Sequence, residues 1–129
     1  MKKITCILMG CFFVLLQSCS TLKDARQAKG QGTSKVYNAP IDQAWATVKQ
    51  TLVELDLPMA GENKEEGYIL AQNGMSIGSS GENVAIFLEK AKEANKTKIE
   101  VVSKKAMATQ IFATNWEPKI IEKLDEKIK

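Results

Sequence analysis

The chain has 129 residues, with 18 basic and 15 acidic side chains, three cysteines and no histidine. Without histidine there can be no histidine-ligated zinc or haem and no catalytic triad with an imidazole base, so we expect neither a metal site nor a bound cofactor. The near balance of charge argues against nucleic acid as a partner, because nucleic-acid binders normally carry a clustered basic face.

Residues 1–18 have the pattern of an export signal. Lys2 and Lys3 precede a mostly apolar, uncharged run from Ile4 to Leu16, as in the charged start and apolar centre of a secretory signal. The run is shorter than the roughly 20 apolar residues of a transmembrane helix. A buried segment of the folded protein is the alternative. Removal of the signal would leave 16 basic and 15 acidic residues, so the processed protein would be close to neutral.

The end of this signal resembles the lipobox of bacterial lipoprotein precursors. Leu16-Gln17-Ser18-Cys19 has the apolar and small residues of that motif before its cysteine, although Gln17 is larger than the usual residue there. A second candidate, Leu8-Met9-Gly10-Cys11, would leave an apolar run of only a few residues. It would also keep Phe12 to Leu16 on the processed protein, so we reject it.

The lipobox resemblance implies that Cys19 is lipidated. Its acyl chains, such as palmitate, would make the membrane of the bacterial cell envelope a partner of the protein. Ser20, rather than aspartate, follows the cysteine, which resembles the signal for passage to the outer membrane in enteric bacteria. Because Cys6 and Cys11 leave with the signal and Cys19 carries lipid, no disulfide is expected.

Residues 20–34 are polar, and Leu22 is almost their only large apolar side chain. Such a stretch cannot bury enough surface to offset the entropy lost on ordering. We therefore expect a lipidated, flexible tether at 19–34, which would span roughly 20 Å as a coil. A single α+β domain would follow at 35–129. A short helix from Thr21 to Ala28 is the alternative to the tether.

The domain is predicted to begin with a short strand at Lys35–Ala39 and a helix after Pro40. Apolar residues follow at spacings of three and four and form one stripe. The stripe contains Ile41, Ala44, Trp45, Val48, Leu52 and Leu55. We interpret Trp45 as a core anchor rather than a ligand-stacking residue, because it lies within the stripe. Leu57-Pro58 ends the helix.

Two hairpins are predicted next. Met59–Lys64 and Tyr68–Gln72 form the first, with a turn at Glu65-Glu66-Gly67 in which glycine supplies a positive φ. The two glutamates diverge in such a turn, so they are not a catalytic pair. Asn73–Gly81, with three glycines and three serines, is expected to be a mobile loop.

Val84–Glu89 and Lys98–Val102 alternate in polarity and form the second hairpin, which turns around Asn95. Its end carries charges of both signs between Lys90 and Lys98. A solvated hairpin end is the favoured interpretation, and a contact with lipid headgroups is the alternative.

The last part of the chain ends in a helix. Lys104–Ala113 fits either a strand or an irregular crossing segment. Thr114 and Glu117 have the spacing of a capping box. An apolar stripe of Trp116, Ile120, Ile121, Leu124 and Ile128 follows. The sheet formed by the hairpins is the simplest partner for this stripe.

The order strand, helix, four strands, helix resembles the small helix-grip-like α+β domains of envelope lipoproteins, such as the outer-membrane assembly lipoprotein C component. Ala39-Pro40-Ile41-Asp42-Gln43-Ala44-Trp45 and Glu66-Gly67-Tyr68-Ile69 carry the resemblance, which covers Lys35 to Lys129. It implies a two-layer sandwich, in which an antiparallel sheet of four to five strands packs against two helices. The whole sequence also resembles small Francisella-type lipoproteins, a group associated with virulence and without an assigned molecular activity.

Three functions fit these features. We favour a non-enzymatic, monomeric module, anchored in the outer membrane and facing the periplasm or the cell surface, that binds an envelope protein or supports the envelope. The second is a binder of a small apolar ligand in a cavity between the sheet and the terminal helix. The third is an enzyme in which a lysine activates Ser76, Ser79 or Ser103. Because common catalytic residue types are missing, we expect no catalytic residue, and Cys19 is the one predicted site.

Overall fold

The computed structural model describes residues 21–74, 81–107 and 112–129. The predicted signal and Cys19 lie outside this part of the chain. The described residues form three helices and five strands. These are α2 (Leu22–Gln27), β1 (Thr33–Tyr37), α3 (Ile41–Glu54), β2 (Met59–Asn63), β3 (Tyr68–Asn73), β4 (Glu82–Lys90), β5 (Thr97–Lys105) and α4 (Trp116–Lys127).

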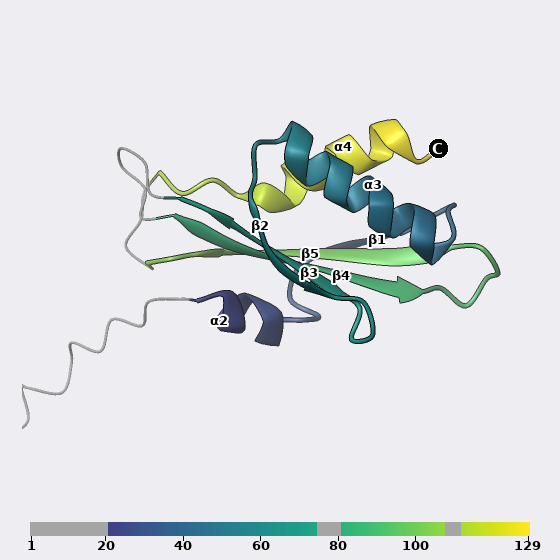
Figure 1. The fold of residues 1–129 in the computed structure, drawn as a ribbon, viewed down its shortest axis with the longest axis horizontal. Helices are drawn as coiled ribbons and strands as arrows, with labels where there is room; N and C mark the ends of the chain where they lie inside the picture. The colour runs from purple at the N-terminus through teal and green to yellow at the C-terminus, as the bar shows by residue number, and fades with distance from the viewer. Residues whose placement is uncertain (1–20, 75–80, 108–111) are drawn as a thin grey trace, which may run out of the picture.

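The five strands form one antiparallel sheet in the order β1-β5-β4-β3-β2. The two nine-residue strands, β4 and β5, lie side by side near its centre, and β1 and β2 form its two edges (Figure 1). This confirms the predicted α+β class, the single antiparallel sheet and the order strand, helix, four strands, helix from β1 onward.

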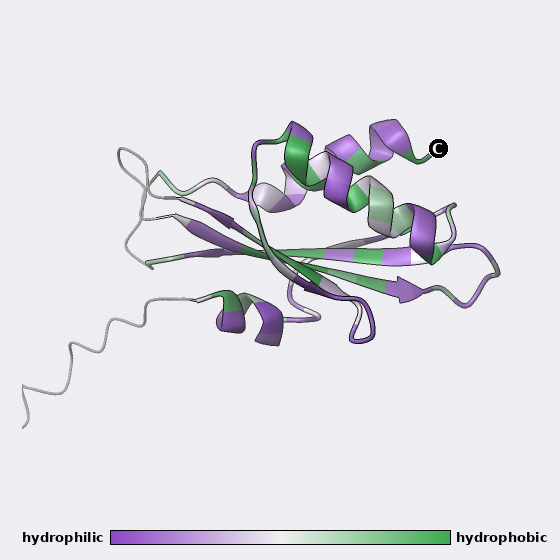
Figure 2. Ribbon diagram, viewed as in Figure 1, coloured by the Kyte–Doolittle hydropathy of each residue, from purple (hydrophilic) through white to green (hydrophobic). Residues whose placement is uncertain are grey.

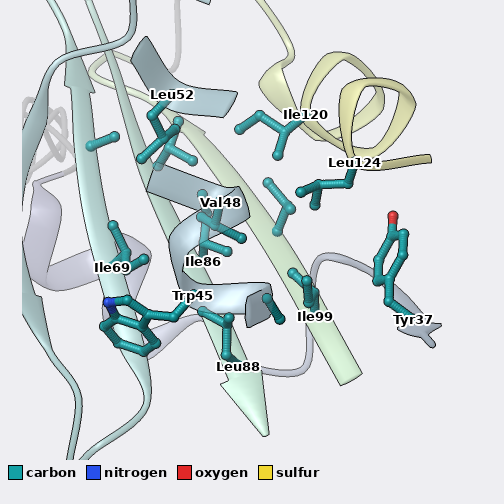
Figure 3. Packing of buried hydrophobic residues seen from close by; sticks show 14 of the residues in the cluster. Tyr37, Trp45, Val48, Leu52, Ile69, Ile86, Leu88, Ile99, Ile120 and Leu124 are labelled. Atoms are coloured by element: carbon teal, nitrogen blue, oxygen red, sulfur yellow. The ribbon is translucent and has the colours of Figure 1, made fainter. Parts of the chain in front are cut away.

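Helices α3 and α4 lie side by side on one face of the sheet (Figure 1). Their apolar stripes and the alternate strand positions that face them form the main core, as predicted. The labelled side chains in Figure 3 point toward one another between these layers: Tyr37, Trp45, Val48, Leu52, Ile69, Ile86, Leu88, Ile99, Ile120 and Leu124. Trp45 is only 6% exposed, which confirms it as a core residue.

Helix α2 packs on the opposite face of the sheet, so the prediction of a flexible tether is wrong for residues 21–34. Its buried Ala25 and Ala28 contact a second apolar cluster that contains Phe87 and Val102. In Figure 2 the outer side of α2 is hydrophilic. The short helix that was the alternative to the tether is therefore the observed structure, and residues 33–34 belong to β1.

Small side chains let residues 21–34 approach the sheet closely, which the composition of the segment does not reveal. Ala25 is fully buried although it offers only a methyl group. Gly32, where the chain returns to the sheet, lies so near β5 that a Cβ atom there would come within 2.0 Å of the Val101 carbonyl oxygen. Close contacts of small residues with the sheet, rather than an apolar stripe, thus hold this segment.

The predicted turns and helix start differ in detail. Gly67 has φ 75°, which confirms the predicted positive φ of that glycine, and Asn95, around which the second hairpin was predicted to turn, has φ 58°. The N-cap of α4 is Asn115, whose side chain accepts a hydrogen bond from the Glu117 N–H at 3.1 Å, so Thr114 is not the cap. Of the ambiguous segment 104–113, the first two residues continue β5 and 108–111 lie outside the described residues, as do 75–80 of the predicted loop.

Candidate functional site

The structure describes one of the three serines that were considered as nucleophiles. Ser76 and Ser79 lie outside the described residues, whereas Ser103 is half-buried on β5. The Ser103 hydroxyl oxygen accepts a hydrogen bond from the Trp116 N–H at 3.3 Å, so it helps to fix the start of α4. Its neighbour Lys104 is on the other face of the strand, where its Nζ donates to Gln31 at 3.2 Å. This geometry is structural rather than that of a lysine-activated serine.

An apolar groove of about 290 Å³ opens where α3 ends and the chain turns into β2. Two large apolar side chains are exposed in it, Val53 at 76% and Met59 at 43%. The complete lining is Lys49, Leu52, Val53, Asp56, Leu57, Pro58 and Met59. The sequence interpretation missed this groove, although Val53 was visible as an apolar residue outside the stripe of α3. We name these seven residues the α3–β2 groove.

The end of α3 shapes one wall of the groove. Asp56 has φ 51°, a left-handed conformation that glycine normally supplies at a helix end. The N–H of Asp56 donates to the Val53 carbonyl at 3.1 Å, and that of Leu57 donates to the Leu52 carbonyl at 2.9 Å. These two bonds form a Schellman motif, in which Leu57 folds back onto Leu52. The motif places the Asp56 side chain at the rim and leaves Val53 uncovered.

A hydrogen-bonded carboxylate joins β2 to α3 beside the groove. Glu62 accepts from Lys49 Nζ at 3.0 Å and from Trp45 Nε1 at 2.8 Å. The hydrogen bond from Lys49, followed by that from Trp45, lowers the pKa of Glu62, so the carboxylate is ionised at neutral pH. The buried indole N–H of Trp45 is thereby satisfied. These contacts tie β2 to α3 beside the groove.

Strand β2 itself is an edge of the sheet. It pairs with β3 on one side, and the strand order places no described strand on its other side. The register shifts between Met59 and Gly61, so the strand is bulged where it leaves the groove. An edge strand presents peptide groups that can pair with another chain. The apolar groove and these peptide groups therefore adjoin one another.

The second notable surface is the face that carries α2. Arg26 lies over the ring of Tyr68, 5.3 Å from its centroid, and donates to its hydroxyl group at 3.1 Å. Lys29 pairs with Glu89, and this hydrogen bond lowers the pKa of the Glu89 carboxyl group. The Gly30 N–H donates to both oxygens of a largely buried glutamate, Glu100, at 2.7 and 3.0 Å. Polar contacts thus fix the segment at both the helix and the following turn.

The interface between α4 and the sheet is closed at its buried positions. Ile120 and Leu124 are both 0% exposed and belong to the main core. The hollow beside α4, of about 670 Å³, lies on its outer side near β1. It is lined by Thr33, Pro118, Ile121, Glu122, Asp125 and Glu126. The α3–β2 groove is an apolar hollow among the described residues that a ligand could enter.

Neither a metal centre nor a membrane-spanning helix is found in the described ranges 21–74, 81–107 and 112–129. No group of three cysteine, aspartate or glutamate residues in them could hold a metal ion. Nor does any helix there have the length and apolar character needed to cross a membrane. Comparisons with protein-family models, with curated proteins and with solved structures found no match. Function is therefore inferred from the residues of this chain alone.

Proposed function

We propose that the protein is an envelope lipoprotein, anchored in the outer membrane through Cys19, that binds a partner protein without catalysing a reaction. The observation that carries the binding role is the exposed apolar α3–β2 groove beside the edge strand β2. Exposed apolar hollows of this kind, bordered by polar residues such as Lys49 and Asp56, are typical of interaction sites.

The occupant that we propose is an extended segment of a partner protein. Such a segment would pair with the outer edge of β2 and place an apolar side chain between Val53 and Met59. In this mode the main-chain hydrogen bonds supply affinity and the pocket supplies specificity. The groove suits it because the apolar lining continues directly into the strand: Met59 both lines the groove and begins β2.

The binding role can be tested by photo-crosslinking in cells that make the full chain. A photoreactive amino acid at Val53 should give one discrete protein adduct, and Met59→Asp in the same chain should abolish it. Val36, which is 48% exposed on the opposite edge strand, is the matched control position and should give no adduct. Equal adducts from the two positions, or none from Val53, would contradict the proposal.

The anchor is tested separately by metabolic labelling with a fatty-acid analogue. Cys19→Ala should lose the label and accumulate as a precursor, whereas Cys11→Ala should keep the label. Retained label in Cys19→Ala would show that lipid is attached elsewhere.

A small apolar ligand is the second candidate occupant, because the groove volume of about 290 Å³ is close to the lower bound of ligand pockets, about 300 Å³. Native mass spectrometry of protein purified from membranes distinguishes the two. A bound small molecule that is lost in Val53→Asp would favour the ligand, and the crosslinked protein adduct would favour the partner segment.

A further inference from the structure

The position of α2 determines how far the proposed anchor lies from the fold. Two peptide units separate Cys19 from Thr21, and they can span at most about 7.6 Å. Thr21 is already fixed: it caps α2 through hydrogen bonds with Asp24, and α2 is docked on the sheet. An acyl chain on Cys19 would therefore hold the fold directly at the bilayer.

The end of the sheet nearest the start of α2 can be identified. Figure 1 shows α2 beginning on the side where β3 ends and β4 begins. Two hydrogen bonds from backbone N–H groups lie at the same end: the Thr114 N–H donates to the Glu82 carboxylate at 2.9 Å, and the Ala106 N–H donates to the Gly81 carbonyl at 3.0 Å. We name this region the α2 end of the sheet.

An exposed aromatic side chain lies at the α2 end. Phe112 is 75% exposed and is two residues before Thr114, whose backbone is tied to the start of β4. Lys23 on α2 and Lys105 at the end of β5 are exposed as well. An aromatic ring with nearby lysines suits the boundary of a bilayer, where rings enter the headgroup region and cations meet anionic lipids.

We propose that the α2 end of the sheet rests on the bilayer and that Phe112 enters its headgroup layer. The proposal relies on the lipid anchor at Cys19 and adds an orientation to it. Acyl chains alone leave a protein free to tumble when a flexible tether joins them to it. Here the docked α2 removes that freedom, and Phe112 supplies a second apolar contact with the membrane.

The opposite end of the sheet should face away from the membrane. The β4–β5 turn, which contains Lys92, is at the far end of β4. Strand β4 has nine residues, so eight steps of about 3.3 Å separate its two ends by about 26 Å, which is close to the thickness of the hydrocarbon core. A fluorophore at Lys92 is thus a matched control for one at Phe112.

The test uses the chain from Cys19 onward, which contains every described residue and one cysteine. Coupling Cys19 to a maleimide lipid anchors this protein to vesicles of phosphatidylethanolamine and phosphatidylglycerol, whether or not cells lipidate it. Phe112→Trp and Lys92→Trp are compared in vesicles with and without brominated lipid. The unsubstituted protein gives the background from the buried Trp45 and Trp116.

Brominated lipid should quench the added fluorescence of Phe112→Trp and leave that of Lys92→Trp unchanged. Ala25→Glu, which forces a charge beneath α2, should reduce the quenching of Phe112→Trp by freeing the anchor. Equal quenching at both positions, or quenching at Lys92→Trp alone, would overturn the proposed orientation. Fatty-acid labelling in cells reports on the anchor itself, so failure of the anchor and failure of the orientation give different results.

Discussion

Phe87→Ala tests whether α2 is part of the fold. Phe87 is 4% exposed because α2 covers it, and Lys29 Nζ lies 5.7 Å from the centroid of its ring. Truncation of a buried phenylalanine costs about 3–5 kcal/mol of unfolding free energy. If residues 21–32 were a tether, the ring would be exposed to solvent on the open face of the sheet, and the change would cost within about 0.5 kcal/mol.

Urea denaturation followed by circular dichroism measures this difference. With a slope of about 1–3 kcal/mol per molar urea, the midpoint of Phe87→Ala should fall by about 1 M or more. Lys98→Ala, a substitution of an exposed residue on the same face, should leave the urea midpoint nearly unchanged. In an Ala25→Glu background, which undocks α2, the cost of Phe87→Ala should shrink, since the two residues share one interface. A midpoint for Phe87→Ala equal to that of Lys98→Ala would refute the packing of α2.

Asp56→Gly should stabilise the protein by about 1 kcal/mol, because glycine adopts the left-handed conformation without the Cβ clash. Ala46→Gly, at an exposed position in the interior of α3, should destabilise it by about the same amount, and urea denaturation checks both changes. Acid should weaken the docking of α2, because Lys29 lowers the pKa of Glu89 below its ordinary value of 4.5 in the folded state. The resulting stability is present above pH 4.5 and is lost as the pH falls through the folded pKa. Glu89→Gln should therefore reduce the loss of unfolding free energy at acid pH. An unchanged loss would show that the pair of Lys29 and Glu89 does not contribute.

The parts of the fold that sequence predicts well are those whose side chains repeat with the period of the element. The stripe around Trp45 predicts α3, and the stripe around Leu124 predicts α4, because each helix buries one face. Alternation in β3 to β5 and the left-handed residues at Gly67 and Asn95 predict the hairpins. These signals lie within each helix, strand or turn, so they can be recognised without knowing which other elements pack against it.

The elements that sequence did not predict depend on contacts between distant segments. The six residues of α2 contain one buried alanine, Ala25, and no apolar stripe, and a second buried alanine, Ala28, caps the helix. The contacts of these alanines with the facing Phe87 and Val102 are therefore not visible in the sequence. The α3–β2 groove is likewise hidden, because it forms only when Met59 folds back beside Val53. Both cases involve small or isolated apolar residues, whose burial or exposure is decided by tertiary structure.

The α3–β2 groove and the docked helix α2 lie on opposite faces of the sheet. Met59 pairs with Ala71, a residue of the main core, which places the groove on the face covered by α3 and α4. Helix α2 packs on the other face, where Phe87 lies. The sheet therefore separates the membrane-proximal segment from the proposed partner site. Met59 pairs near the end of β3 and Asn63 pairs with Tyr68 at its start, so β2 runs away from the α2 end. An extended partner segment could therefore pair with the outer edge of β2 without displacing the anchor.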